Sequence, residues 1–191
     1  MYKGRGFTLV EMVVVLLVLS ILLGVIMFSF FALQHNSSIQ TQKMLLDGQV
    51  ISFTNLLEKE FRMLGFSPID NAGFGIVYGD NDSILYTTDN DGDGLVDPNE
   101  IRAFYLNNDT VFYYNGTDQM GVLMDVDSLT FIFVDTSGST LSCPIQEVDI
   151  MGNVVNGHVV KMVYYSIVAS TKYGKNTIET RKSGTIGFKN R

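Results

Sequence analysis

The 191 residues include twenty acidic and thirteen basic side chains, which gives a formal net charge of −7. An acidic chain without a basic stripe is poorly suited to hold nucleic acid through its phosphates, so no nucleic-acid partner is expected. The length allows one modest domain beside a membrane segment. The lone cysteine, Cys143, excludes an internal disulfide, and a buried, inert thiol is expected there.

A long apolar segment begins at Phe7, behind a short leader that carries Lys3 and Arg5. Residues 12–33 contain no charge, and as a helix they would span about 33 Å, enough for a hydrocarbon core of roughly 30 Å. The basic leader predicts a cytoplasmic N-terminus and an exported remainder. An ordinary secretory signal peptide is disfavoured because the run is too long and no small-residue cleavage site follows it.

A plain membrane anchor does not account for Glu11, because a carboxylate at the edge of a membrane helix is costly and indicates a function. The segment GRGFTLVEM, residues 4–12, resembles the type IV prepilin signal. The resemblance implies that a prepilin peptidase cleaves after Gly6 and that the new N-terminal residue, Phe7, is methylated. Eleven basic residues then remain against twenty acidic ones, a balance of −9.

The same resemblance implies a role for Glu11 in filament assembly. Glu11 becomes the fifth residue of the mature chain, where its carboxylate would pair with the N-terminal ammonium of a neighbouring subunit. Two charges in a medium of low dielectric constant are tolerable only as a pair, so this role is physically sensible. The chain departs from many major pilins in one respect: its apolar run contains no proline.

Beyond the apolar run the pattern becomes that of a helix with one buried face. Gly65 and the following Pro68 predict where this helix ends. We expect one long helix, with an interruption near residues 35–38 as an alternative, whose second half packs on a β-sheet; a coiled-coil surface is the other interpretation. The apolar stripe consists of Leu46, Val50, Phe53, Leu57, Phe61 and Leu64.

After Pro68, short runs rich in β-branched and aromatic residues predict strands separated by turns. Tight turns are expected at residues 107–109 and at Asn115–Gly116, whereas residues 135–157 show no regular pattern. The predicted fold class is α+β, the type IV pilin fold, with a long N-terminal helix on an antiparallel sheet domain. The expected strands are residues 75–78, 83–87, 101–106, 110–114, 128–134, 159–169 and 183–188.

Four parts are predicted along the chain. They are a leader peptide at residues 1–6, the transmembrane half of the helix at 7–33, its amphipathic half at 34–65 and a β-rich extracytoplasmic domain at 66–191.

The acidic segment DNDGDGLVDPNE, residues 89–100, matches the EF-hand calcium loop position by position. Gly94 falls where that loop turns sharply, and Ca²⁺ takes six to eight oxygen ligands. Because the flanks look like strands, we expect an EF-hand-like loop in a hairpin with a structural Ca²⁺; a solvated Asp/Gly turn is the alternative. The candidate ligands are Asp89, Asp91, Asp93, the backbone carbonyl of Leu95, Asp97 and Glu100.

Nothing in the sequence predicts an enzyme. The two histidines, His35 and His158, belong to no nucleophile, zinc or nucleotide motif. A pairing of Cys143 with His158 is conceivable but has no supporting local pattern.

Three further segments resemble PilW-type minor pilins and J-type minor pseudopilins of type II secretion: residues 56–68, 126–135 and 185–190. We therefore expect a minor pilin or pseudopilin in the bacterial inner membrane, which assembles with other pilins and helps to initiate or cap a filament. The alternative function is a membrane-anchored module that binds Ca²⁺ or another ligand outside any filament. The Gly6 and Glu11 signature discriminates between the two.

Overall fold

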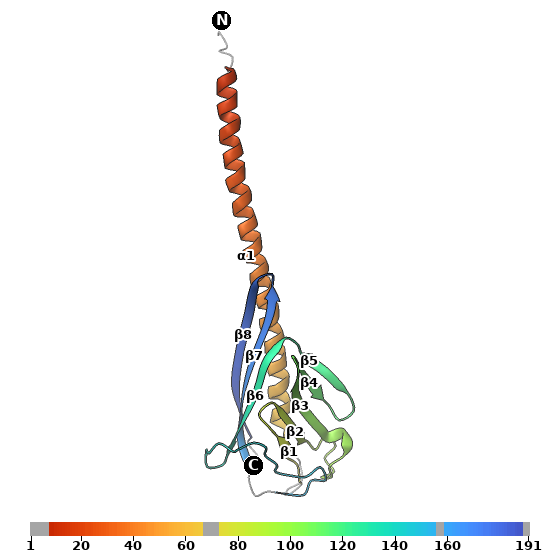
Figure 1. The fold of residues 1–191 in the computed structure, drawn as a ribbon. Helices are drawn as coiled ribbons and strands as arrows, with labels where there is room; N and C mark the ends of the chain where they lie inside the picture. Colours follow the sequence, from red (N-terminus) through yellow and green to blue (C-terminus); the bar gives the residue numbers. More distant parts are fainter. Residues whose placement is uncertain (1–7, 67–72, 156–158, 189–191) are drawn as a thin grey trace. The chain divides into compact units, whose positions relative to one another are not determined.

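The structure, a computed structural model, describes residues 8–66, 73–155 and 159–188. It has one long α-helix, α1 (Leu9–Met63), followed by antiparallel strands (Figure 1). This arrangement confirms the predicted α+β class and is consistent with the type IV pilin fold. The chain forms two compact units, Met1–Gln42 and Lys43–Arg191.

Helix α1 is continuous across residues 35–38, so the alternative with an interruption there is wrong. In the first unit, the part of the helix from Met12 to Leu33 is apolar on every side, and the side chains from Leu9 to Leu33 are exposed. A helix that is hydrophobic all round needs an apolar environment. Among the described residues, α1 is the one helix long and apolar enough to cross a membrane.

In the second unit α1 buries the stripe that the sequence predicts. The exposed fraction of these side chains is 4% or less. The helix ends at Met63, and Gly65 takes the left-handed conformation (φ 66°) that a helix C-terminus commonly requires. The Gly65 N–H also donates to the Thr87 carbonyl oxygen at 3.1 Å, which joins the helix end to the sheet.

Within the described residues, eight antiparallel strands form two sheets, in which consecutive strands pair. The first sheet contains β1 (Ile76–Gly79), β2 (Ser83–Thr87), β3 (Ile101–Asn107), β4 (Thr110–Tyr114) and β5 (Gln119–Leu123). The second contains β6 (Val126–Asp135), β7 (Val160–Tyr173) and β8 (Asn176–Gly187). A short 3₁₀ helix, η1 (Pro98–Glu100), precedes β3.

The expected turns at 107–109 and at Asn115–Gly116 are confirmed, because they connect β3 to β4 and β4 to β5. Strand β5 is not in the predicted set, and β6, β7 and β8 are longer than predicted. The difference is greatest for β7 and β8 at the ends where they join. These two strands also meet in a tight turn at Gly174–Lys175. The described part of 135–157 is largely irregular and carries only isolated bridges, such as that between Gly79 and Ile145.

The core lies where the second half of α1 meets both sheets (Figure 1). The Phe53 ring packs edge-to-face on Phe104 of β3, with ring centroids 5.9 Å apart. Phe61 contacts Tyr86 of β2 at 5.8 Å and Phe131 of β6 at 5.9 Å. Burial of one such ring stabilises a fold by roughly 1.5–3 kcal/mol. The stripe is therefore core, and the coiled-coil interpretation is wrong for this surface.

Candidate functional site

The N-terminal candidate residues lie at the start of α1. Thr8 directly precedes the helix, and its N–H and hydroxyl donate to Glu11 Oε2 at 2.8 and 3.0 Å. The Glu11 N–H donates back to the Thr8 hydroxyl oxygen at 3.3 Å. This reciprocal pair is a capping box, which satisfies backbone donors that a helix start leaves open.

Glu11 is exposed and stands among exposed apolar neighbours such as Val10 and Met12. Oε1 takes part in none of the hydrogen bonds found among the described residues. The carboxylate is therefore held at the helix start by one oxygen and can accept a further partner through the other. The other two predicted residues of this motif, Gly6 and Phe7, lie outside the described residues.

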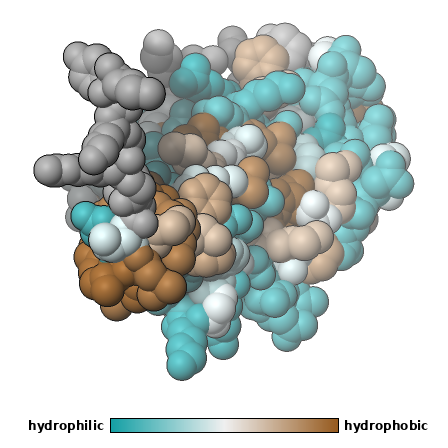
Figure 2. Space-filling model, turned by 90° about the horizontal axis from the view of Figure 1, so that it is seen from above, coloured by the Kyte–Doolittle hydropathy of each residue, from teal (hydrophilic) through white to brown (hydrophobic). Residues whose placement is uncertain are grey.

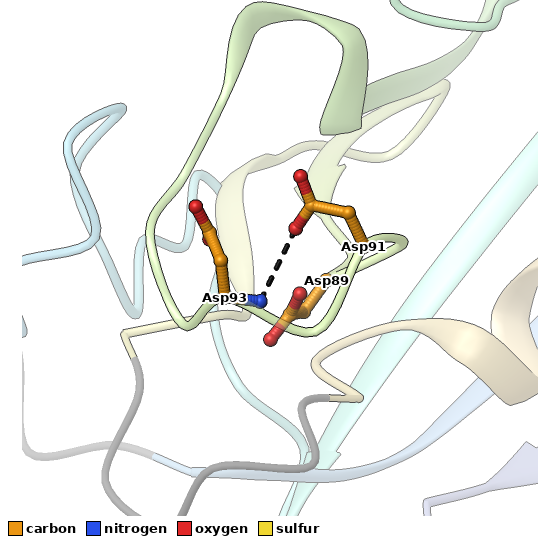
Figure 3. A group of neighbouring side chains, drawn as sticks. All are labelled: Asp89, Asp91 and Asp93. Atoms are coloured by element: carbon orange, nitrogen blue, oxygen red, sulfur yellow. Dashed lines mark hydrogen bonds between the residues drawn. The ribbon is translucent and has the colours of Figure 1, made fainter.

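The acidic loop joins β2 to β3 and brings three of its predicted ligands together. One carboxylate oxygen from each of Asp89, Asp91 and Asp93 lies within 4.8 Å of the others, and Figure 3 shows the three groups at the turn of the loop. Asp89 is buried, with 3% of its surface exposed, whereas the other two are exposed. Asp97 and Glu100 are not part of this group.

Backbone N–H groups of the loop itself orient the three carboxylates. Asp89 accepts from the N–H groups of Gly92 at 2.6 Å and Gly94 at 3.2 Å. Asp91 accepts from the Asp93 N–H at 3.2 Å, and Asp93 accepts from the Leu95 N–H at 2.8 Å. Gly94 has a φ of 78°, which favours glycine at the loop position where the chain turns.

Glu100 closes the loop from inside the domain. Its side chain is 1% exposed. Oε1 accepts from the Asn90 N–H at 2.6 Å, and Oε2 accepts from the Asp97 N–H at 3.1 Å. One carboxylate therefore ties the second residue of the loop to the ninth. Because each carboxylate oxygen has two lone pairs, these bonds leave acceptor capacity on Glu100.

The rest of the domain holds both ends of this loop. The Asp89 N–H donates to the Phe66 carbonyl at 3.0 Å, and the Thr88 N–H donates to the Glu100 carbonyl at 3.1 Å. The Arg102 guanidinium donates to the Asn99 carbonyl at 2.7 Å. The five acidic residues are thus carried by a loop with fixed ends, built from oxygen donors that suit a hard cation.

The remaining chemical candidates lie in ordinary surroundings. Cys143 is half-buried, less than expected, and burial together with the nearby Asp80 raises the pKa of its thiol. A raised pKa disfavours the reactive thiolate. His35 is exposed on α1, and His158 lies outside the described residues.

Sequence reasoning did not identify the polar contacts that join α1 to the sheets. Tyr165 of β7 donates to Glu58 Oε1 at 2.9 Å. Tyr86 donates to Glu60 Oε2 at 3.4 Å, and Thr180 of β8 donates to Asp47. In the sequence these acidic residues form part of the polar face of a helix. Their partners are more than twenty residues away in the chain, so no local pattern indicates the contacts. The Thr8–Glu11 capping box, by contrast, has a local signal in its T-x-x-E spacing.

The comparison with protein families matches the N-terminal part of the chain. Residues 1–27 match the family described as the prokaryotic N-terminal methylation motif. No curated protein matches the chain, and no solved structure matches it.

Proposed function

We propose that this chain is a minor pilin or a minor pseudopilin of a type II secretion system. Its methylation motif and its long apolar helix fit a type IV pilin-like protein. The motif points to a structural subunit and to anchoring in the inner membrane. The matched residues 1–27 carry this proposal, because they include the leader, the cleavage position and the start of the membrane helix.

The proposed maturation has two steps. Prepilin peptidase cleaves between Gly6 and Phe7, which removes the charges of Lys3 and Arg5, and Phe7 is then methylated at its new amino group. The mature chain then starts with an apolar helix that carries a single carboxylate near its beginning, at Glu11. This helix can slide out of the bilayer and into a filament without carrying the basic leader across.

The proposed role of Glu11 is to pair with the N-terminal ammonium of a neighbouring subunit. A carboxylate among membrane-facing apolar side chains is costly unless a partner neutralises it. The hydrogen bonds from Thr8 satisfy Oε2 but do not neutralise the charge. Glu11 is thus fixed in position before assembly, and the missing element is a positive charge from another chain.

Mass spectrometry and a Glu11→Gln variant test this proposal. The mature chain is expected to begin at methylated Phe7. Glutamine retains the acceptor that a capping box needs but not the charge, so Glu11→Gln is expected to lower the filament-bound fraction at least about tenfold, which corresponds to about 1.4 kcal/mol. An N-terminus at Met1, or Glu11→Gln subunits that assemble like the parent, would refute the proposal.

Thr8→Val is the matched control. It removes the hydroxyl that bonds Glu11 while it leaves the carboxylate in place. The variant is expected to keep assembling, because only the capping box is weakened, by about 0.5–2 kcal/mol at most. Equal losses in Thr8→Val and Glu11→Gln would assign the effect to the helix start rather than to intermolecular pairing.

A structural Ca²⁺ is the second part of the proposal. Asp89, Asp91 and Asp93 supply the clustered carboxylates, and the Leu95 carbonyl, Asp97 and Glu100 would complete a shell of oxygen ligands. The support is the agreement between the EF-hand spacing and a loop whose ends are fixed. The single cysteine allows no internal disulfide. A Ca²⁺ ion that binds the folded domain and not the unfolded chain would stabilise the domain in another way.

The alternative function, a membrane-anchored binding module outside any filament, uses the same loop. It requires neither processing at Gly6 nor a charge at Glu11. The N-terminal mass and the Glu11→Gln variant therefore decide between the two functions, whereas calcium binding by itself does not.

A further inference from the structure

Charge is unevenly distributed over the second unit. Residues 80–149, which contain the first sheet, the acidic loop and β6, have fourteen acidic side chains and one basic one, Arg102, a balance of −13. Residues 160–188, which form the β7–β8 hairpin, have five basic side chains and one acidic one, Glu179, a balance of +4. Seen from above, hydrophilic residues cover much of the outline of the domain (Figure 2).

Two contacts show which way the β7–β8 hairpin points along α1. Tyr165 bonds Glu58, and Thr180, which pairs with Ala169, bonds Asp47. As β7 runs from residue 165 to residue 169, it therefore passes along α1 from the level of residue 58 to the level of residue 47. Strand β7 and helix α1 thus run in opposite directions. The hairpin runs toward Lys43, the N-terminal end of the helix in this unit.

The hairpin extends well past its last contact with the helix. The final pair, Tyr173 and Asn176, lies four residues beyond Ala169, about 13 Å at roughly 3.3 Å per residue. Lys43 lies four residues before Asp47, about 6 Å along the helix. The turn at Gly174–Lys175 therefore reaches at least the level of Lys43 and forms one end of the second unit.

This end of the unit is basic and exposed. We define the basic tip as Lys43, Lys172 and Lys175, all of which are exposed. Two nearby acidic groups have local partners: Asp47 accepts from Thr180, and Glu179 forms an ion pair with Arg181. Asp125 contacts the hairpin through its backbone carbonyl, which accepts from the Ser170 N–H, three residues short of Tyr173. Tyr173 adds an amphipathic ring of the kind enriched where membrane meets water.

Within the tip, Lys43 is the residue of the second unit nearest in the chain to the membrane segment. The apolar run ends at Leu33, ten residues before Lys43. We propose that the basic tip binds the phosphate groups of anionic phospholipids while the subunit stands in the membrane before assembly. This inference rests on the membrane insertion in the proposed function but not on filament formation.

The physical basis is electrostatic. Each Lys near an anionic bilayer surface contributes about fivefold to binding, and the attraction falls off within a Debye length. The rest of the domain has the opposite sign, and the balance of −13 over residues 80–149 disfavours the approach of the first sheet and the acidic loop to the same surface. Entry of the subunit into a filament would break these contacts and release the lipid.

Hydrogen–deuterium exchange of the full chain in nanodiscs that hold one copy each tests the proposal. Amides of residues 171–177 are expected to exchange about five- to twenty-five-fold more slowly when phosphatidylglycerol is mixed into phosphatidylcholine than in phosphatidylcholine alone. The difference should vanish in about 1 M salt, where the Debye length is about 3 Å. Equal exchange in the two lipids would overturn the proposal.

Lys172→Gln/Lys175→Gln is expected to abolish the difference between the lipids. The matched control is Lys59→Gln/Arg62→Gln, which removes the same charge from exposed positions near the C-terminal end of α1 and should behave like the parent. Protection that appears only at several copies per disc, whatever the lipid charge, would assign the tip to a second copy and overturn the lipid proposal. A chain that inserts but shows no lipid dependence leaves the filament proposal untouched.

Discussion

A single buried carboxylate, that of Glu147, joins the irregular segment after β6 to both sheets. It is 7% exposed. Oε2 accepts from the Ile76 N–H of β1 at 2.9 Å, and Oε1 accepts from the Val160 N–H of β7 at 2.6 Å. One side chain thus satisfies a strand end in each sheet, which explains how a segment without regular pairing keeps its place.

Glu147→Ala should therefore be severely destabilising. Both N–H groups would lose their acceptor in a buried site, at about 1–3 kcal/mol each. We expect the free energy of unfolding to fall by about 3 kcal/mol, and the melting temperature by roughly 6–12 °C for a domain of this size. Denaturant unfolding of the full chain in detergent measures the change in the free energy of unfolding.

Glu179→Ala provides the matched control for that experiment. Glu179 is exposed, and its ion pair with Arg181 lies on the surface of β8. Surface ion pairs contribute about 0–1 kcal/mol. If both variants lose the same stability, the two bonds of Glu147 do not carry the effect.

At the scale of elements, hydrogen-bonded tyrosines fix α1 against the sheets. Burial, and then the hydrogen bond to Glu58, raises the pKa of Tyr165 to about 12 from its ordinary value of 10. The pKa values of Tyr86 and Tyr113 are raised in the same direction, chiefly by burial and also by Glu60. The bonds from Tyr165 to Glu58 and from Tyr86 to Glu60 require the neutral phenol as donor.

This dependence sets the response of the fold to alkaline pH. A phenol whose pKa is higher in the folded state binds its proton more tightly there, so its contribution is complete below the unfolded pKa of 10 and is lost as pH rises toward 12. We expect the free energy of unfolding to decrease over that window. Tyr165→Phe should make the decrease shallower, and denaturant midpoints across the window measure this.

Tyr164→Phe is the control, because its exposed ring lies on the opposite side of β7 from Tyr165. It is expected to leave the alkaline decrease unchanged. A decrease that stays equally steep in Tyr165→Phe would show that the bond between Tyr165 and Glu58 does not contribute to the pH response.

The elements that the sequence predicted well are those with a local period or spacing. The buried stripe follows from residues three and four apart, and the turn at residues 107–109 follows from its Asn-Asn-Asp composition. The missed strand β5 begins with Gln119, Met120 and Gly121, which have little strand preference. It is a strand because β4 pairs with it.

Strand β8 shows the same limit at greater length. Its central residues, Glu179 to Ser183, are polar and mostly exposed, and they resemble a loop. Their backbone groups nevertheless pair with β7 throughout, from Met162–Gly187 to Tyr173–Asn176. For the acidic loop, spacing alone identified the cluster of Asp89, Asp91 and Asp93, but not the backbone partners of Glu100, which depend on the folded loop.

At the scale of the whole molecule, the proposed Ca²⁺ makes the domain's stability depend on the medium. Binding to the folded state alone stabilises by about 1.4 kcal/mol when the free ion is at ten times its Kd. For a domain of this size that raises the melting temperature by roughly 3–6 °C. Thermal melts of the full chain in detergent, with EDTA and with millimolar Ca²⁺, measure it, and identical melts would contradict the proposal.

Asp91→Asn/Asp93→Asn separates the metal from the loop. These exposed side chains keep an oxygen acceptor for their backbone bonds but lose the charges that repel each other without a cation. We expect the variant to be at least as stable as the parent in EDTA and to gain nothing from Ca²⁺. A variant that still responds to Ca²⁺ would place the ion elsewhere.

The contacts of α1 with β7 and β8 join segments that are synthesised at different times. Glu58 and Tyr165 are 107 residues apart in the chain, and Asp47 and Thr180 are 133 residues apart. Ribosomes add about 5–20 residues per second, so the helix emerges on the order of 10 s before the strands that cover it. Until β7 and β8 emerge, the side of α1 that the second sheet covers is open to water, and a chaperone has time to bind it.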